Sequence, residues 1–140
     1  MARFSGGCAC GAVTYQATSD PVATRICMCR ICQRLTGGAG TVIAFFPTDA
    51  VSIAGETGDF SSPADSGNIM HRRFCQACGT PLFSTAEVRP HLFGIRVGSL
   101  DDPSSVTPTA IVWTEEAPAW ALLDPQLDHF PGQMPAPVAK

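Results

Sequence analysis

Residues 74–80 read FCQACGT, and the two cysteines in this stretch, Cys75 and Cys78, form a C-x-x-C pair followed by Gly79. This spacing lets both sulfurs point at one metal ion, and the glycine permits the positive φ angle or close backbone approach that such a turn needs. Two thiolates do not complete the tetrahedral shell of a structural zinc ion. A second pair of ligands must therefore come from elsewhere in the chain.

The second pair is predicted to be the C-x-C of Cys8 and Cys10, which lies in the glycine-flanked segment GGCACG at residues 6–11. In an extended strand, side chains two residues apart lie on one face, so both sulfurs can reach one ion. Four thiolates leave no open position, which is typical of a structural zinc site. The predicted structural site is the four-cysteine cluster, Cys8, Cys10, Cys75 and Cys78.

The remaining cysteines lie within six residues, in the segment CMCRIC at positions 27–32. This three-cysteine cluster, Cys27, Cys29 and Cys32, has no eighth cysteine to complete it, because the chain contains seven. Three protein ligands leave one position open for water or substrate, as in catalytic zinc sites. The alternatives are a different pairing of the seven cysteines, or a shell closed by a carboxylate or by one of the three histidines, His71, His91 and His129.

An open zinc site with three thiolates carries one net negative charge and is a weak Lewis acid, so it is poorly suited to ionising water. It is well suited to binding one more soft ligand, a thiol held as thiolate. The cluster therefore predicts an enzyme that activates a small thiol or makes and breaks a carbon–sulfur bond. Three nearby arginines are candidates for attracting an anionic thiol: Arg25, Arg30 and Arg34.

The composition is that of a compact globular protein. The chain has 140 residues, 45% hydrophobic and 15% charged, which suits one domain over residues 1–140 with a core at about 5–132. The net charge of −3 gives no indication of nucleic-acid binding. We expect no membrane span and no signal peptide, and the odd cysteine count favours a reducing cytoplasm over a disulfide-bonded setting. The oligomeric state is not indicated.

Short β-strands dominate the predicted secondary structure, in keeping with 13 glycines and 12 prolines. The segment at residues 30–36 is predicted to be a short helix that ends at Gly37 and Gly38. Residues 58–67 are predicted to be a loop, residues 98–103 a turn, and the tail from Pro131 irregular. The predicted strands are 12–17, 22–28, 41–46, 51–54, 68–74, 81–84, 91–97 and 109–113.

Three ordered motifs carry a resemblance to a known family. They are GCACGAVTY at residues 7–15, CMCRIC at 27–32 and FCQACGTPL at 74–82. Further matches are Gly37, the GSLDDP stretch at 98–103, Trp113, Trp120 and FPG at 130–132. Over roughly residues 5–132, the chain resembles the glutathione-dependent formaldehyde-activating enzyme (GFA) family, which includes centromere protein V-like proteins.

The resemblance implies a mainly β fold, the β-tent, made of short antiparallel sheets braced by zinc. It implies two Zn²⁺ ions per chain: a structural one on the four-cysteine cluster and a catalytic one on the three-cysteine cluster. It also implies a carbon–sulfur lyase activity that joins glutathione and formaldehyde to give S-(hydroxymethyl)glutathione. Family members often carry histidine where this chain has Met28 and Ile111.

Two other functions start from the same cysteines. One is a non-enzymatic, zinc-braced module that binds a protein partner, which requires the three-cysteine cluster to be closed by another ligand. The other is a methionine-sulfoxide reductase, which shares the β-tent architecture. It requires a nucleophilic cysteine outside the metal sites, and both clusters together use all seven.

Overall fold

The computed structural model describes residues 3–64 and 66–134, which are mainly β-structure, as predicted. The smaller of two sheets has three strands in the order β1–β2–β5, all antiparallel. Its strands are β1 (Phe4–Gly7), β2 (Thr14–Ala17) and β5 (Val51–Ala54).

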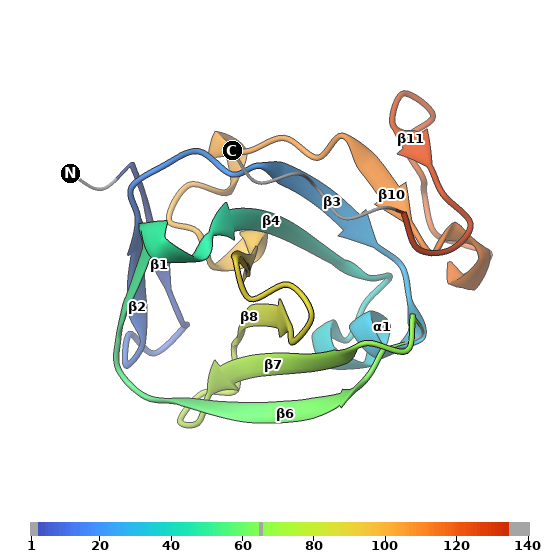
Figure 1. Cartoon of the computed structure of the whole chain (residues 1–140). Coiled ribbons are helices and arrows are strands. Elements are labelled where there is room, and N and C mark those ends of the chain that lie inside the picture. Colours follow the sequence, from blue (N-terminus) through green and yellow to red (C-terminus); the bar gives the residue numbers. More distant parts are fainter. Residues whose placement is uncertain (1–2, 65, 135–140) are drawn as a thin grey trace.

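The larger sheet has eight strands in the order β11–β10–β3–β4–β9–β8–β7–β6. Figure 1 shows it bending round, so that β3 and β4 lie opposite β7 and β6, with β1 and β2 at one end and helix α1 at the other. Its strands are β3 (Ala23–Cys27), β4 (Thr41–Pro47), β6 (Thr57–Pro63), β7 (Ile69–Cys75), β8 (Pro81–Ala86), β9 (Leu92–Arg96), β10 (Ala110–Val112) and β11 (Asp128–His129).

The helix α1 (Arg30–Thr36) spans the predicted residues and is capped at both ends. Cys29 is its N-cap, and the Cys29 sulfur accepts from the backbone N–H of Cys32. Gly37 ends the helix in the left-handed conformation, at φ 73°, and donates to the carbonyl of Gln33. These two caps confine the helix to about two turns beside the three-cysteine cluster.

The predicted loop at residues 58–67 is wrong for its first part, because residues 58–63 belong to strand β6. This strand lies at the edge of the larger sheet. An edge strand needs no alternation of buried side chains and tolerates a proline such as Pro63 at its end. The polar composition of residues 58–63 therefore gave no indication that they form a strand.

Two other features departed from the predictions. Strand β1 was missed because it contains Gly6 and Gly7, and glycine is uncommon in strands. The strand needs glycine at position 6, because a Cβ there would collide with the carbonyl of Ser99 and the hydroxyl of Tyr15. Strand β10 pairs in parallel with β3 and β11, not antiparallel. Strands β9 and β10 run in the same direction, so the connection between them returns the chain to the end of the sheet where β9 begins. This connection includes two short turns of 3-10 helix, η2 (Val97–Ser99) and η3 (Pro103–Ser105).

The core is formed by inward-facing side chains of both sheets. Phe46, Phe83 and Ile95 are fully buried, and Tyr15 packs edge-on against Phe83 with ring centroids 5.3 Å apart. The core cluster also includes Cys8 and Cys75, so the four-cysteine cluster adjoins the packed interior.

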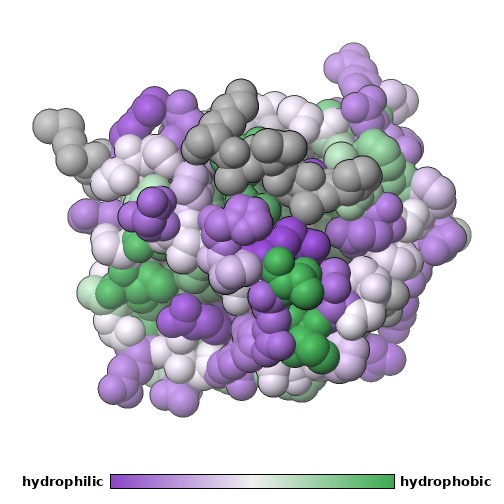
Figure 2. All heavy atoms as spheres, in the orientation of Figure 1, coloured by the Kyte–Doolittle hydropathy of each residue, from purple (hydrophilic) through white to green (hydrophobic). Residues whose placement is uncertain are grey.

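On the face of the molecule seen in Figure 2, hydrophilic residues predominate and hydrophobic residues lie in separate groups. Among the described helices, none has the length and apolar character needed to cross a membrane. Residues 131–134 contain neither helix nor strand, and the rest of the predicted irregular tail lies outside the described residues.

Three further short segments complete the chain: η1 (Thr48–Ala50) leads from β4 into β5, η4 (Thr114–Glu116) follows β10, and irregular backbone connects η4 to β11.

Candidate functional site

The four-cysteine cluster forms where two turns meet. Its four sulfurs lie within 4.8 Å of one another. The Cys10 sulfur is 3.6 Å from that of Cys8 and 3.8 Å from that of Cys75. With Zn–S bonds of about 2.3 Å, a regular tetrahedron places its sulfurs about 3.8 Å apart. The cluster therefore has the dimensions of a four-thiolate zinc site, and the predicted pairing of the two motifs is the one that the fold brings together.

Both turns have a backbone suited to this arrangement. Gly11 follows the first pair at φ 82° and Gly79 follows the second at φ 80°, in a region that favours glycine. The backbone N–H of Gly79 donates to the carbonyl of Cys75 at 2.8 Å, which closes the C-x-x-C turn. The Thr80 hydroxyl joins the two turns, since it accepts from the backbone N–H of Ala9 at 3.1 Å.

Hydrogen bonds favour the thiolate form of two sulfurs in this cluster. The hydroxyl of Thr80, 3.1 Å from the Cys78 sulfur, together with the Thr80 backbone lowers the pKa of Cys78 to about 5. The backbone N–H of Val13 lies 3.3 Å from the Cys8 sulfur and lowers the pKa of Cys8. The thiolate is the form that binds metal.

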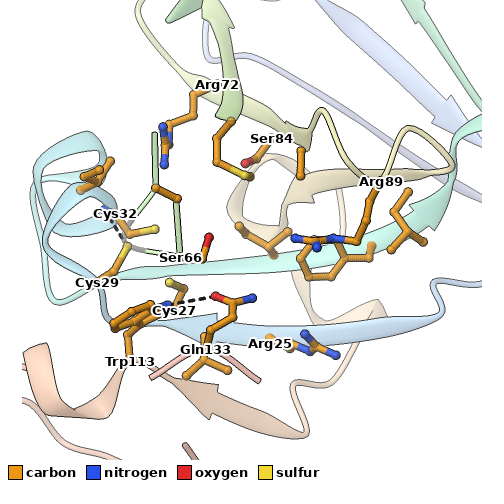
Figure 3. Close-up of a pocket in the computed structure, with 18 of the residues that line it drawn as sticks. Arg25, Cys27, Cys29, Cys32, Ser66, Arg72, Ser84, Arg89, Trp113 and Gln133 are labelled. Atoms are coloured by element: carbon orange, nitrogen blue, oxygen red, sulfur yellow. Dashed lines mark hydrogen bonds between the residues drawn. The ribbon is translucent and has the colours of Figure 1, made fainter. Parts of the chain in front are cut away.

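The three-cysteine cluster lies where β3 passes into α1. Cys27 is the last residue of β3, Cys29 caps α1, and Cys32 lies in the first turn of the helix. Their sulfurs also lie within 4.8 Å of one another. The backbone N–H of Cys32 is 3.4 Å from the Cys29 sulfur (Figure 3). Local chain geometry alone therefore gathers these three ligands.

Proton sharing in this cluster indicates a need for a cation. Hydrogen bonds from Cys27 and then Cys32 lower the pKa of Cys29 to about 2, which favours its thiolate form. Hydrogen bonds with Cys29 and then Cys32, followed by burial, raise the pKa of Cys27. Three thiolates at this spacing repel one another, and a divalent ion removes the repulsion. Both clusters thus have donor sets that fit a metal ion such as zinc.

The three-cysteine cluster opens into a cavity of about 120 Å³. Figure 3 shows the thiols at one end, with Arg72 above them and Arg89 and Arg25 toward the opposite end. Among the described residues that line the cavity there are four arginines and no aspartate or glutamate. Because the whole chain carries a net charge of −3, this concentration of positive charge is local.

Two of these arginines are buried near the sulfurs. Arg72 and Arg96 are 6% and 5% exposed, and burial lowers the pKa of Arg72 while the charge of Cys32 opposes that effect. Arg72 Nη1 donates to the Ser62 hydroxyl at 2.9 Å. Arg96 Nε and Nη1 are buried and have no hydrogen-bond partner among the described residues. A buried guanidinium requires negative charge nearby, which a thiolate–metal cluster supplies.

None of the described histidines joins either cluster. His71 lies between two carboxylates, 2.8 Å from Asp59 and 2.7 Å from Glu87. His129 Nε2 lies 2.8 Å from the carbonyl of Asp124, and His91 is exposed. The alternative shell of three cysteines and one histidine is therefore not formed by the residues that the structure describes.

Of the three arginines that the sequence offered as candidates for attracting an anionic thiol, one lines the cavity. Arg25 lines the cavity, whereas Arg34 is exposed and Arg30 contacts the side chain of Gln33, outside it. Arg72, Arg89 and Arg96 come from later segments and were missed. One signal was available for Arg96, which is the only charged residue in HLFGIRV at residues 91–97, where the strand is otherwise apolar and buried.

Two aromatic residues differ in their surroundings. Trp113 lines the cavity in the left-handed conformation, at φ 59°, and its Nε1–H donates to Gln133 Oε1 at 3.1 Å. Trp120 is 71% exposed. Trp113 thus anchors Gln133 at the cavity, a role that the sequence did not indicate.

Met28 and Ile111, where family members often have histidine, are not among the described residues lining this cavity. Met28 is 6% exposed and faces a separate surface depression beside the end of α1, and Ile111 is 1% exposed in β10. Both substitutions are apolar and buried, so they leave the lining of the three-cysteine cavity unchanged.

Similarity to known proteins extends over the part of the chain that holds both clusters. The family model "Glutathione-dependent formaldehyde-activating enzyme" matches residues 3–116, which include all seven cysteines. A crystal structure of a Rhodobacter sphaeroides protein has 21% sequence identity and a TM-score of 0.53, covering 74% of this chain and 91% of that one. This likeness shows a shared fold. By the family match over most of its length, the chain belongs to the glutathione-dependent formaldehyde-activating enzyme family.

Proposed function

We propose that this protein is a zinc-dependent carbon–sulfur lyase that acts reversibly on the aldehyde adduct of a small thiol, with glutathione and formaldehyde as the first pair to test. The observation that carries the proposal is the three-cysteine cluster, whose three sulfurs face an arginine-lined cavity and have no fourth ligand among the described residues. The family match supports the same reaction class.

We assign different roles to the two clusters. The four-cysteine cluster would hold a structural zinc, because its four sulfurs can supply all the ligands of a tetrahedral site and two of its cysteines belong to the core. The three-cysteine cluster holds the catalytic zinc, which when bound offers its remaining position to a thiol and favours the thiolate form. A cytoplasmic setting is proposed with this assignment, since it keeps cysteines reduced.

The chain's own residues would balance the charge of the bound thiolate. A zinc ion with three thiolates carries one negative charge, and a fourth thiolate raises this to two. Arg72 and Arg96 supply two positive charges beside the cluster, buried where solvent screens them little. The cavity is therefore electrostatically suited to a fourth thiolate.

In the forward direction, the substrate sulfur forms a bond to the formaldehyde carbon. The π electrons of the carbonyl move to its oxygen, and the proton lost by the thiol ends on that oxygen. We propose that solvent carries this proton; the described residues that line the cavity include no carboxylate or histidine. Two groups at the cavity would donate hydrogen bonds to the developing oxyanion: the hydroxyl of Ser84 and the amide NH₂ of Gln133. The amide oxygen of Gln133 accepts from Trp113 Nε1–H, which leaves its NH₂ group as the donor.

The proposal is tested by cobalt substitution. Added glutathione should change the visible absorption of the cobalt-loaded protein, and exchange NMR should show faster formation of S-(hydroxymethyl)glutathione than the uncatalysed reaction. The control is Cys29→Ser, which retains the four-cysteine cluster and should lose both effects. An unchanged cobalt spectrum with every thiol tried would refute the lyase and leave a zinc-braced module as the remaining function.

A further inference from the structure

The three-cysteine cavity includes an apolar chamber that is larger than formaldehyde requires. Phe45 of β4, Ala86 of β8 and Leu92 of β9 line this chamber. Formaldehyde contributes one carbon to its adduct and brings no hydrocarbon group to cover these side chains. Because apolar walls gain dispersion contacts only from atoms packed against them, the chamber favours a ligand with a hydrocarbon group of its own.

The chain places the apolar chamber at the end of the cavity away from the sulfurs. Figure 3 shows Ser84 between the thiols and Arg89. Ala86 follows Ser84 by two residues in β8, and Leu92 begins β9. The backbone of Arg89 joins these two strands: its N–H donates to the carbonyl of Ala86 at 3.0 Å, and its carbonyl accepts from the N–H of Leu92 at 3.1 Å. A ligand group that starts at the thiols therefore passes Ser84 before it reaches the chamber.

A glycine lies in the wall between Ser84 and the apolar chamber. Gly94 pairs with Phe45 on one side and with Ser84 on the other. A Cβ at this position would lie 2.6 Å from the carbonyl oxygen of Ser84 and 3.0 Å from the side chain of Ile43. Since Ile43 and Phe45 both line the cavity, a side chain at position 94 would push the wall into it. Glycine at this position preserves the width of the chamber.

The size of the cavity suits a short hydrocarbon group. Its volume is about 120 Å³. Apolar cavities of about 150 Å³ remain dry and take up benzene. The cavity must also receive the thiol sulfur, which leaves room for about three or four carbons by the same comparison. Arg25 does not interrupt the chamber, because its guanidinium is engaged at the wall, with Cζ 5.8 Å from the centre of the Phe45 ring.

The order of these groups along the cavity assigns the hydrocarbon to the aldehyde. In the proposed reaction, the thiol sulfur lies at the three-cysteine cluster and the hydroxyl of Ser84 donates to the carbonyl oxygen. The carbonyl carbon then lies between them, and its substituent continues past Ser84 toward Ala86 and Leu92. Formaldehyde has only hydrogen at this position, whereas a longer aldehyde has an alkyl chain.

We infer that the substrate is an aldehyde that carries a short alkyl group, and that the apolar chamber is the subsite that selects it. This inference rests on the proposed function, because it names the aldehyde that the same cavity takes. The thiolate sulfur forms its bond to the carbonyl carbon, the π electrons move to the oxygen, and the proton from the thiol ends on that oxygen. The product is a hemithioacetal whose alkyl group is buried in the chamber.

The test compares butanal with formaldehyde, each with glutathione, by exchange NMR of the hemithioacetal. For each aldehyde, kcat/KM is divided by the rate constant of the uncatalysed addition, which corrects for the different reactivity of the two carbonyls. This acceleration should be at least about tenfold larger for butanal, a factor that burial of two methylene groups supplies. Equal acceleration, or a larger one for formaldehyde, would overturn the inference and leave the lyase standing.

Two variants change the size of the chamber in opposite directions. Ala86→Leu adds a larger side chain to its wall and should reduce the ratio of the two accelerations to near one. Met70→Ala removes a side chain that lines the cavity on the strand paired with Ala86, and should favour hexanal over butanal more than the wild type does. The control, Ala12→Leu, makes the same change as the first variant at an exposed position outside the cavity and should keep the wild-type ratio.

The outcomes separate this inference from the function on which it rests. Circular dichroism identifies the variants that fold. Unchanged ratios in folded Ala86→Leu and folded Met70→Ala would overturn the chamber as the subsite, whatever the rates with formaldehyde. If the wild type accelerated neither aldehyde, the lyase would be refuted and this inference with it.

Discussion

The two cysteine clusters use the same ligand chemistry in opposite surroundings. The four-cysteine cluster joins turns more than sixty residues apart and adjoins the core, with hydroxyl and backbone donors at its sulfurs. The three-cysteine cluster is gathered from one short segment, and it faces a cavity lined by arginines. A metal ion that links distant parts of a chain contributes to folding, whereas one held by a local segment can be open to a ligand without loosening the fold.

The largest difference is expected in stability. Cys75→Ser removes a proposed zinc ligand that is 1% exposed, lies at the end of β7 and has its sulfur 3.8 Å from that of Cys10. Structural zinc contributes on the order of 10 kcal/mol in small domains, so this variant should be largely unfolded without excess metal. Far-UV circular dichroism with thermal melting measures the loss. Equal losses of Tm in Cys75→Ser and Cys29→Ser would contradict the division of roles.

The second difference concerns ligand binding. Cys29→Ser should keep the fold and one metal ion per chain, and lose the response of the cobalt spectrum to thiols. Cys29 caps a helix of only seven residues, and serine is also a good N-cap, so the cost to stability is small. Metal analysis and absorption titration check both parts. Retained thiol binding in this variant would place the thiol site elsewhere.

The third prediction concerns pH. Two influences lower the pKa of Cys32: first the hydrogen bond with Cys27, and then the charge of Arg96. Cys29 and burial raise it. Arg96→Met should raise the thiol pKa values, so that protons displace the metal at higher pH. The midpoint of cobalt release from the three-cysteine cluster should rise by about one pH unit.

The matched control for this shift is Arg34→Met, which removes the same charge from an exposed helix position and should leave the midpoint unchanged. Release from the four-cysteine cluster should also keep its midpoint, because no arginine is among the groups that shift the pKa of Cys8 or Cys78. A shift of both clusters together would indicate a general loss of stability.

The smallest effect is expected at His71, which was one of the candidate fourth ligands. Its contacts with Asp59 and then Glu87 raise its pKa, so the ion pairs stabilise the fold at low pH and are lost as pH rises through the raised value. His71→Gln should lower Tm slightly at acidic pH and have no effect at alkaline pH. Its metal content should equal that of the wild type. Loss of a metal ion would make His71 a ligand.

The cysteine motifs were readable from sequence because their spacing is local. A C-x-x-C or C-x-C pair depends on one turn, and the glycines beside it mark that turn. The short helix at residues 30–36 was equally local, with a side-chain cap at Cys29 and Gly37 after its end. The family resemblance rests on these motifs, and the match over residues 3–116 confirmed it.

The cavity could not be predicted in the same way. Arg25, Arg72, Arg89 and Arg96 come from separate segments, and only the curvature of the larger sheet brings them to one space. Strand β6 was missed because an edge strand need not bury alternate side chains. Burial of a charged side chain is a property of the assembled fold, and a lone arginine in a strand gives only a faint signal of it.

Cadmium NMR of protein loaded with two cadmium ions tests the central claim most directly, because each ion reports its own ligand shell. Two signals are predicted, and addition of glutathione should move one of them, assigned by its absence in Cys29→Ser, while the other stays in place. A single signal, or two signals that both ignore the thiol, would contradict an open three-cysteine site beside a closed four-cysteine one.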